Sequence, residues 1–533
     1  MQASSTDICI IGSGLAGLYA AIESRLMGMG VTVCSKSSPG RGSCTAVSQG
    51  QFRTSSATFN PAEHKRLTLE AGRGLNNSEA LDKFVQNAAH DVHKLESFGV
   101  FLNHHGRGFD PRSDKIDTKG LSITKPMAEY ARSIGVRFLA PFFASGIATD
   151  DNRAIGLWGV AGSNGQPVLI PCRSLILASG GAGALYSRTD NPQGMTGDGY
   201  ALALYSGLPL IDMEFVQFHP LCTGRNRTRQ LLPSLLCEVG SLENVKGEDI
   251  IAKHEIEARP AAIAARDALC QAMAFEVQAG LGFPDGALRL RIHQDQALWD
   301  QAKKVYGLEN VANLWRLSKK HITKNNGSIP VLPAAHFCMG GIVAGSDGAT
   351  SLTGLFVAGE VVGGLHGANR YGGNALTEAA VFGRIAADGA FRVAKNLHTP
   401  AWSRIEHPDT RGGKSTETDQ ESYQELRRRI QEIMWSKAGI LRSEAALRSA
   451  QGDLDALRSA LPLTCAHAHG GGRGPLELRN MHTVAEAIVR SARSRKESRG
   501  SHFRTDFPYQ NEAFDKHILV HRKEKEIRAY CSA

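Results

Sequence analysis

The segment from Asp7 to Lys36 constrains the fold more than any other part of the chain. An apolar run leads into Gly-Ser-Gly-Leu-Ala-Gly, and apolar residues then recur at helical spacing before a second apolar run. This order predicts a strand, a tight turn, an amphipathic helix and a second strand. Gly12 permits the turn, Gly14 lets backbone amides approach a pyrophosphate, and Gly17 lets the helix pack on the strand. Because the positive end of a helix attracts anions, the segment predicts a dinucleotide-binding site.

The second predicted strand ends in Cys34, Ser35 and Lys36. Many dinucleotide-binding folds place an acidic residue at this point, where it holds a ribose. The lack of an acidic residue in this chain argues against a plain NAD site.

Composition and cysteine spacing narrow the class of protein. The 533 residues, 42% hydrophobic and 21% charged, predict a globular protein of two or three domains. The ten cysteines form no CxxC or CxxCH pattern, which excludes the common metal and haem signatures and assigns any electron chemistry to an organic cofactor. No apolar run reaches eighteen residues and no leader precedes Asp7, so we expect a cytoplasmic protein without direct membrane insertion.

The net charge of +9 is modest for this length and concentrates late in the chain, at Arg490–Lys496 and His521–Lys525. Aromatic residues do not alternate with these basic residues, so we expect no binding to nucleic acid. A solvated face or a docking surface for an acidic partner fits the pattern better.

Two apolar segments far from the first turn predict further strands of the same sheet. Ser174–Ala178 and Leu352–Glu360 each combine a buried-strand run with small residues. A nucleotide-binding domain assembled from separated segments implies an inserted domain, which we place at about Leu221–Pro330.

A further domain is expected near the C-terminus. Polar, glycine-rich stretches at Pro408–Ser422 and Ala468–Gly474 interrupt the apolar pattern. The segment Tyr423–Leu461 between them predicts charged amphipathic helices.

Several motifs follow one another in the second part of the chain. They are Gly180–Gly183, Asn191-Pro192, Thr196–Gly199, Asp212–Pro220, His336–Ile342, His366–Leu376 and Glu497–Pro508. In this order they closely resemble the flavoprotein subunits of fumarate reductase and succinate dehydrogenase, with L-aspartate oxidase as a relative. The resemblance runs from Asp7 to Pro508 without a break.

The resemblance implies an α/β fold in which a Rossmann-like FAD-binding domain is interrupted by an α+β capping domain and followed by a helical C-terminal domain. The implied boundaries are residues 1–220 and 333–400 for the FAD-binding domain, 221–332 for the capping domain and 401–533 for the C-terminal domain. FAD is implied in place of NAD. Family members hold an unsaturated dicarboxylate between the flavin ring and the cap, where a hydride passes between flavin N5 and one alkene carbon.

The resemblance also implies catalytic residues. His219, His336 and Arg370 match the clamp that holds a substrate carboxylate, whose polarisation makes the adjacent double bond a better hydride acceptor. Taken singly, each histidine could be a hydrogen-bonded core residue and Arg370 an ordinary ion-pair residue. Arg266 matches the arginine that serves as the family's proton shuttle, which requires a very strongly basic partner. The alternative is that Arg266 pairs with Asp267 or caps a carbonyl.

The same matching assigns the FAD contacts. The pyrophosphate contacts are Gly12, Gly14 and Gly17, and Ser35 and Lys36 lie near the adenosine end. The flavin ring is lined by Ser43, Cys44, Thr45, Gln49 and Gly50, and Asn374 and Leu376 complete the ring contacts. The carboxylates of Asp198 and Glu360 approach ribose or ribityl hydroxyls.

Two departures from the family concern the cofactor. In the respiratory members a histidine is covalently joined to the flavin, and the matching position here is Cys44. We therefore expect noncovalent FAD, with a thioether as the alternative. Ala375 stands where those members usually carry serine, which removes one hydrogen bond and implies a small redox adjustment.

A third departure concerns the substrate. Counting back from Gly247-Glu248, the Thr-Glu pair that grips the second carboxylate falls on Leu232-Pro233, whose side chains cannot hydrogen-bond a carboxylate. Fumarate should then bind poorly unless another cation replaces the pair. Arg225, Arg227 and Arg229 could supply that cation, could bind a larger anionic tail, or could form a solvated basic loop.

Three functions follow from these observations. The first is an FAD-dependent reductase of an unsaturated carboxylate, or the reverse dehydrogenase, that exchanges electrons with an iron–sulfur or other electron-transfer subunit and could meet a membrane through it. The second is an L-amino acid oxidase, because Pro333–His336 and Gly364–His366 resemble L-aspartate oxidase, although Arg370–Asn374 is nearer to the reductases. The third is a non-catalytic FAD-bearing subunit of a redox complex.

Overall fold

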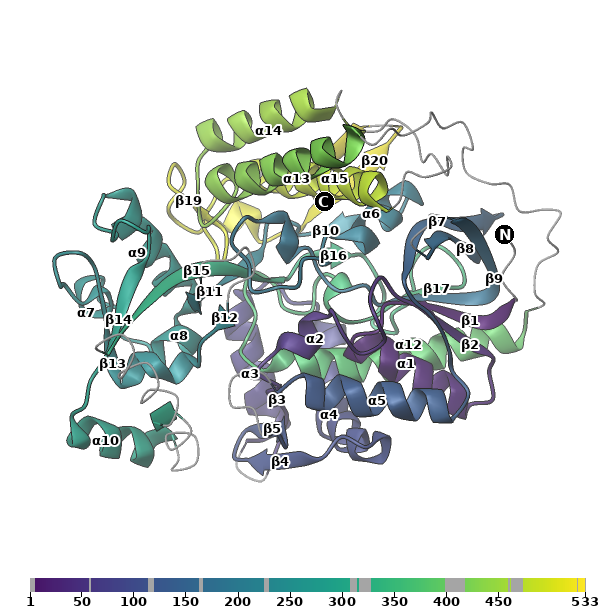
Figure 1. Ribbon diagram of the computed structural model, residues 1–533, viewed down its shortest axis with the longest axis horizontal. Coiled ribbons are helices and arrows are strands. Elements are labelled where there is room, and N and C mark those ends of the chain that lie inside the picture. The colour runs from purple at the N-terminus through teal and green to yellow at the C-terminus, as the bar shows by residue number, and fades with distance from the viewer. Residues whose placement is uncertain are drawn as a thin grey trace.

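The computed structural model describes residues 5–56, 59–113, 119–162, 166–224, 230–306, 314–315, 327–397, 418–458, 461, 473–524 and 526–532. Figure 1 shows three parts: a main domain around one sheet, a cap at the left, and a group of helices above. The fold class expected from the sequence is confirmed. Among the described residues, no helix combines the length and the apolar character that a membrane crossing requires.

The sheet of the main domain joins segments from both ends of its sequence. Its strand order is β6-β2-β1-β9-β8-β7, with β17 paired to β9. The half of β9 near Leu177 pairs in parallel with β1 and β17, and the half near Gln166 pairs antiparallel with β8. The predicted strands at Ser174–Ala178 and Leu352–Glu360 are thereby confirmed. The strands are β1 (Thr6–Ile11), β2 (Val31–Cys34), β6 (Arg137–Leu139), β7 (Phe142–Asp150), β8 (Arg153–Ala161), β9 (Gln166–Leu177) and β17 (Leu355–Val357).

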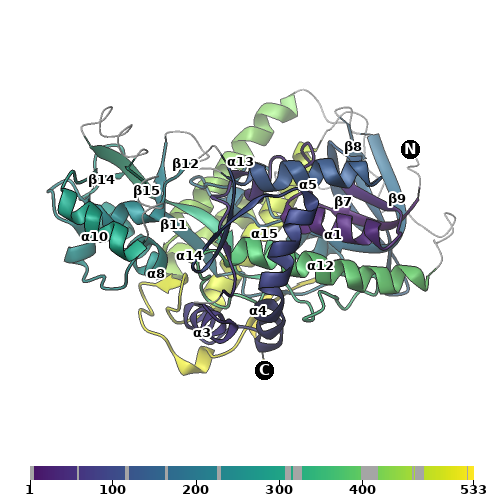
Figure 2. The ribbon, with the colours of Figure 1, turned by 90° about the horizontal axis from the view of Figure 1, so that it is seen from below.

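Helices cover this sheet where apolar faces meet. Helix α1 packs closely on α12, and the two lie side by side in Figure 2. A Cβ atom on Gly383 would lie 2.8 Å from the Ala16 carbonyl oxygen, so the small residue permits this approach. The other helices and strands of the main domain surround this pair of helices and the sheet. The elements are α1 (Leu15–Leu26), α2 (Cys44–Val47), β3 (Phe52–Arg53), α3 (Pro61–Gly72), α4 (Ser78–His93), β4 (Leu102–His105), β5 (Gly108–Pro111), α5 (Leu121–Ser133), α6 (Asp198–Tyr205), β10 (Leu210–Ile211), β16 (Gly341–Ile342) and α12 (Asn374–Lys395).

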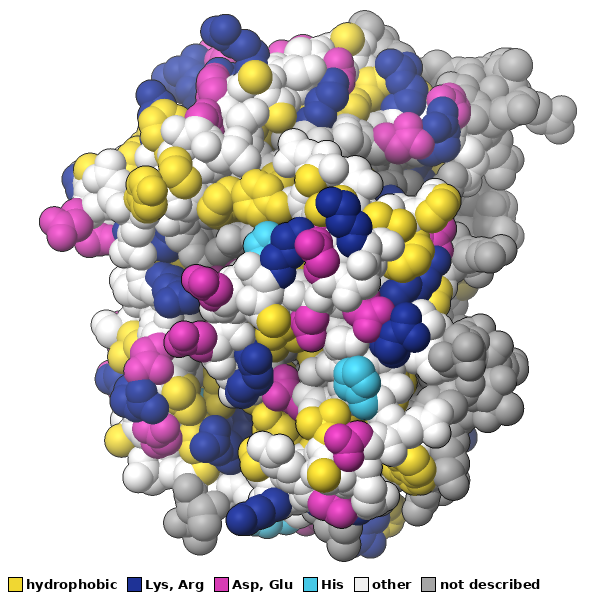
Figure 3. Space-filling view, turned by 90° about the vertical axis from the view of Figure 1, so that its left-hand side faces the viewer, with side chains coloured by type: hydrophobic (Ala, Val, Ile, Leu, Met, Phe, Trp, Pro, Cys, Tyr) yellow, Lys and Arg dark blue, Asp and Glu magenta, His cyan; other side chains and the backbone are white. Residues whose placement is uncertain are grey.

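The cap is built on a five-stranded sheet of order β12-β11-β15-β14-β13 with its own apolar core. Strands β11 and β15 enter it from the main domain and cross the expected boundaries at residues 220 and 332. In Figure 3, which shows this side of the molecule, basic and acidic side chains alternate over the surface. The elements are β11 (Val216–Thr223), β12 (Gln230–Leu231), β13 (Gly240–Glu243), α7 (Ile250–Lys253), α8 (Ala261–Ala264), α9 (Arg266–Gln278), β14 (Leu288–Ile292), α10 (Gln296–Tyr306) and β15 (Ser328–Cys338).

The C-terminal part contains the expected helices and one unexpected hairpin. Strand β20 pairs with β10 of the main domain, so the end of the chain extends a sheet that begins some three hundred residues earlier. The polar stretches expected at Pro408–Ser422 and Ala468–Gly474 lie largely outside the described residues. The elements are α13 (Thr418–Lys437), β18 (Leu441–Arg442), α14 (Glu444–Arg458), α15 (Gly474–Ser494), β19 (Phe503–Arg504), β20 (Ile518–Lys523) and β21 (Glu526–Cys531).

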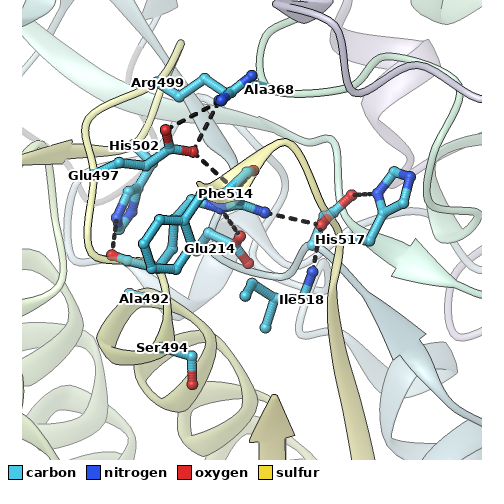
Figure 4. A network of polar contacts seen from close by, with 12 residues as sticks. Glu214, Ala368, Ala492, Ser494, Glu497, Arg499, His502, Phe514, His517 and Ile518 are labelled. Atoms are coloured by element: carbon cyan, nitrogen blue, oxygen red, sulfur yellow. Dashed lines mark hydrogen bonds and ion pairs between the residues drawn. The ribbon is translucent and has the colours of Figure 1, made fainter. Parts of the chain in front are cut away.

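A buried ionic network fastens this C-terminal part to the main domain (Figure 4). Arg495, which is fully buried, pairs with Glu214 at 2.5 Å and Glu497 at 2.9 Å. His517 contacts Asp212 at 2.6 Å, and this carboxylate raises the pKa of His517. Because removing one member would leave a buried charge without its partner, the network locks the two parts together.

Candidate active site

One cavity of about 1270 Å³ runs from the turn between β1 and α1 to the cap. Its lining includes Gly12 and Gly14 at one end, Glu360 in the middle, and His219 and Arg266 at the other. Residues from the main domain, the cap and the C-terminal part all contribute. The cavity therefore joins the predicted nucleotide and substrate regions.

The glycines of the first turn have the geometry that a pyrophosphate cradle needs. Gly12 has a φ of +110°, and a Cβ atom there would lie 2.2 Å from the Ala178 carbonyl oxygen. A Cβ atom on Gly17 would lie 2.1 Å from the Gly12 carbonyl oxygen, so Gly17 lies beneath the turn and not in the cavity lining. Gly14 caps the start of α1, whose free amides face the cavity.

Lys36 ties this end of the cavity to the C-terminal part. Its ammonium group lies 2.6 Å from Asp198 and 2.9 Å from Glu477 on α15. Burial acts to lower the pKa of Lys36, but the two carboxylates outweigh it and raise that pKa. Ser35 lies beside the turn, with its hydroxyl 2.9 Å from that of Ser13. The sequence analysis did not identify Glu477, because only the fold brings α15 to this place.

The region expected to meet the flavin ring contains a buried donor that has no partner. The Gln49 amide nitrogen is buried and makes no hydrogen bond. Ser43 accepts from Ala46 N at the start of α2, and Thr45 accepts from Leu15 N at 3.2 Å. Gly50, like these residues, lines the cavity. A buried donor without a partner is costly, so this wall fits a ligand that presents acceptors, as a flavin ring does.

Burial raises the pKa of two titratable groups beside this wall. Burial and the nearby Glu360 raise the pKa of the Cys44 thiol well above its ordinary value. Burial raises the pKa of Glu360 to about 7, although its carboxylate accepts from Cys338 N at 3.0 Å. A neutral thiol is a weak nucleophile, which disfavours attack by Cys44 on a ring methyl group.

The two residues at the start of α12 differ in position. Leu376 lines the cavity. The Asn374 side chain instead points into the main domain, where it bonds His64 at 2.8 Å and Thr68 at 3.0 Å. The structure therefore does not bring the Asn374 side chain to the cavity, because its amide is committed to holding α3 against α12.

At the cap end, two buried arginines share one neutral acceptor. Arg266 and Arg370 each donate to the side-chain oxygen of Gln217, both at 2.9 Å. Gln217 is itself held by donation to Asn369 at 2.7 Å. Among the described residues, no carboxylate forms an ion pair with either guanidinium. Burial and the charge of Arg266 lower the pKa of Arg370 to about 9, so both groups are cationic at neutral pH.

Two histidines complete this end of the cavity, with ring centres 5.4 Å apart. Leu221 N donates to Nδ1 of His219, so its Nε2 carries the proton that goes to Ser234 Oγ at 3.2 Å. Burial and the charge of Arg266 lower the pKa of His219 well below its ordinary value, which keeps the ring neutral. His336 Nδ1 lies 2.6 Å from Asp190, which leaves Nε2 for a ligand.

Apolar side chains occupy the two cap positions that match the family's polar pair. Leu232 is buried in the cap core, and Pro233 and Leu235 line the cavity. Neither Leu232 nor Pro233 can hydrogen-bond a carboxylate through its side chain. Polar cap residues also line the cavity, namely Ser234, Arg259 and Tyr306, and the Ser234 hydroxyl can donate because it accepts from His219. Arg225, Arg227 and Arg229 lie outside the described residues.

The structure therefore brings His219, Arg266, His336 and Arg370 together. It also adds three residues that the sequence analysis missed: Gln217, Asp190 and Ser234. All three lie within or beside segments already noted, but their roles depend on partners from distant segments.

Comparisons with known proteins agree with this geometry. A family model described as an FAD binding domain matches residues 7–376, and one described as the fumarate reductase flavoprotein C-term matches residues 427–530. One of the subunits of a fumarate reductase (CoM/CoB) from Methanothermobacter marburgensis is 30% identical, and the match covers 97% of both chains. L-aspartate oxidase 1 from Ralstonia nicotianae is 32% identical over 94% of this chain and 95% of its own.

Solved structures show the same likeness. A quinol–fumarate reductase chain solved with menaquinol molecules has a TM-score of 0.85 at 26% identity, covering 100% of this chain and 98% of that one. Adenylylsulfate reductase from Archaeoglobus fulgidus, at 19% identity and a TM-score of 0.74, shares the fold. The cradle, the buried donor at the flavin wall and these matches together place the chain in the family of FAD-dependent oxidoreductases of the fumarate reductase and succinate dehydrogenase flavoprotein type.

Proposed function

We propose that the protein interconverts an α,β-unsaturated carboxylate and its saturated form. The observation that carries this proposal is the pair formed by Arg266 and Arg370, two buried cations that share a neutral acceptor in the same cavity as the FAD cradle. Two like charges held together without a carboxylate are stabilised by an anion from outside. A substrate carboxylate supplies that anion.

Each residue at this end then has a chemical task. Arg370 binds the substrate carboxylate and draws electron density toward it, which makes the β-carbon electrophilic. Burial lowers the pKa of His336, but a bound carboxylate favours its imidazolium form, in which Nε2 donates to the substrate while Nδ1 stays on Asp190. FAD, when bound and reduced, supplies the hydride that this carbon accepts. Arg266 gives a proton to the neighbouring carbon, whose carbanion-like character makes it a strong enough base, and solvent restores the proton. His219 is neutral and donates to Ser234 Oγ, whose hydroxyl proton is then free to go to the substrate.

The residues that hold FAD follow from the cavity lining. Gly12 and Gly14 contact the pyrophosphate, Gln49 donates to the flavin ring, and Asp198 and Glu360 accept from ribose or ribityl hydroxyls. The cofactor is noncovalent because the Cys44 thiol is neutral. We further propose that a separate electron-transfer subunit, of the iron–sulfur kind, exchanges electrons with FAD. The domain boundaries near residues 220, 332 and 400 stay predictions, since strands β11 and β15 run across the first two.

The test is reoxidation of the FAD-loaded protein after anaerobic reduction with dithionite. Addition of unsaturated acids should restore the flavin absorbance, and Arg266→Ala should slow this step by about 10²–10⁴-fold, the usual contribution of a positioned proton donor. The matched control is Arg291→Ala, since Arg291 lies in the cap but pairs with Glu243 at the surface. Equal rates for Arg266→Ala and the control would remove Arg266 from the mechanism.

L-aspartate oxidase activity is the second candidate, because relatives with that name cover nearly the whole chain. Production of hydrogen peroxide on adding L-aspartate in air would place it first. If neither unsaturated acids nor amino acids change the flavin spectrum, the chain is a non-catalytic FAD-bearing subunit.

A further inference from the structure

A third arginine lines the cavity from the main domain. Arg53 ends β3, and its Nε donates to the Gly372 carbonyl oxygen at 3.2 Å. Its guanidinium carbon lies 5.1 Å from the centre of the Tyr371 ring and 6.0 Å from that of Phe59. These contacts fix the guanidinium at the cavity wall without neutralising its charge.

A fourth guanidinium lies close to Arg53. Arg107 also lines the cavity and lies 5.6 Å from the Phe59 ring centre, so both cations contact the same aromatic side chain. Among the described residues, neither Arg53 nor Arg107 forms an ion pair with a carboxylate. Two lysines that also line the cavity have carboxylate partners instead: Lys36 pairs with Asp198 and Glu477, and Lys119 pairs with Asp110. Two like charges beside a cavity and without counterions form an anion-binding site.

This second cationic site lies close to the first one. Gly372 separates them: its carbonyl oxygen accepts from Arg53, and a Cβ atom on it would lie 4.0 Å from Nη2 of Arg266. Tyr371, the preceding residue, also contacts both sites: its carbonyl oxygen accepts from Arg370 and its ring contacts Arg53. A small ligand can therefore reach both sites.

We propose that Arg53, supported by Arg107, binds a second carboxylate of the substrate. The inference rests on the proposed function and concerns where a second carboxylate is held, a task that the resemblance assigns to a polar pair on the cap. One carboxylate lies against Arg370, and the other lies against the main domain, because Leu232 and Pro233 stand in place of that pair. Arg53 is thus the residue that selects dicarboxylates over monocarboxylates, in place of a polar pair on the cap.

The test measures binding instead of turnover. FAD-loaded protein, kept reduced by dithionite under anaerobic conditions, is titrated with saturated acids that reduced flavin can neither reduce nor oxidise. Succinate and glutarate are compared with butyrate and valerate, while the flavin spectrum reports occupancy. The wild-type protein should bind the better dicarboxylate at least about tenfold more tightly than the matching monocarboxylate, as one charge-assisted contact provides. Arg53→Met should remove most of that ratio, Arg107→Met should reduce it, and Arg53→Lys should keep part of it.

Three results would overturn the inference. Equal weakening of both acid classes by Arg53→Met would mean that Arg53 only supports the turn at Gly372. A changed flavin reduction potential with an unchanged ratio would mean that the cation serves the cofactor. Monocarboxylate binding and reduction without any preference for dicarboxylates would refute this inference while leaving the proposed function intact, whereas binding of neither class would refute both.

Discussion

The sharpest prediction concerns Gln217, the neutral acceptor between two buried guanidinium groups. Gln217→Glu keeps the shape of the side chain but places a negative charge 2.9 Å from a nitrogen of Arg266 and a nitrogen of Arg370. The new carboxylate competes with the substrate carboxylate for the same two cations. Binding of carboxylic acids should therefore weaken although no contact to the ligand is removed.

The magnitude follows from Coulomb's law. A substrate carboxylate on the far side of the guanidinium groups would lie roughly 7 Å from the new charge, which costs about 2.4 kcal/mol at an effective dielectric constant of about 20. This free energy corresponds to about fifty-fold weaker binding. The variant should not lose thermal stability, because two new ion pairs offset the loss of the amide donor that now bonds Asn369.

The assay combines two measurements on FAD-loaded protein. Titration with butyrate or succinate, followed by the flavin spectrum, gives the dissociation constant, and a thermal melt gives Tm. Gln217→Met is the control, because it removes the shared acceptor without adding charge and should lower Tm while binding weakens less than in Gln217→Glu. If Gln217→Glu binds acids as tightly as the wild type does, the two arginines are not the anion site.

Three further predictions concern the cofactor end of the cavity. Burial raises the pKa of Glu360 from its ordinary value near 4.5 to about 7, so between these two pH values the folded apoprotein binds more protons than the unfolded chain does. The free energy of unfolding should therefore fall as the pH rises from about 4.5 to about 7. Urea titrations across this range measure the slope, and Glu360→Gln should flatten it. Lys36→Met should weaken FAD binding and lower Tm, because Asp198 loses its cation and Glu477 keeps only Arg427, at a cost below the about 3–5 kcal/mol of a fully broken buried pair. An unchanged flavin titration would contradict this. Acid precipitation should leave the flavin in the supernatant, whereas a yellow pellet would mean that Cys44 is joined to it.

Local sequence was sufficient wherever the chemistry depends on neighbouring residues. The turn at Gly12 and Gly17 was predictable because glycine alone tolerates the positive φ of Gly12 and the close backbone contacts at both positions. The buried strands were predictable because a continuous apolar run indicates burial on both faces. The motifs around His219 and Arg370 pointed to one end of the site, because each motif is a short contiguous pattern.

Asn374 shows where such reasoning ends. It belongs to a matched motif, yet its side chain bonds His64 and Thr68 on α3 and does not reach the cavity. Glu477 shows the converse, because a residue in an unremarkable helix becomes the counterion of Lys36. The direction of a side chain depends on which distant element packs against it, and periodicity does not report that.

By itself, then, the amino-acid sequence determined the nucleotide cradle and the family, and it pointed to three candidate clamp residues and one candidate proton donor, because these lie in contiguous motifs. The tertiary structure alone decided that Gln217 joins two arginines, that Arg53 faces the same cavity, and that β20 completes a sheet with β10. The physical reason is that hydrogen bonds and ion pairs act over a few ångströms of space, whereas their partners here come from segments tens to hundreds of residues apart along the chain.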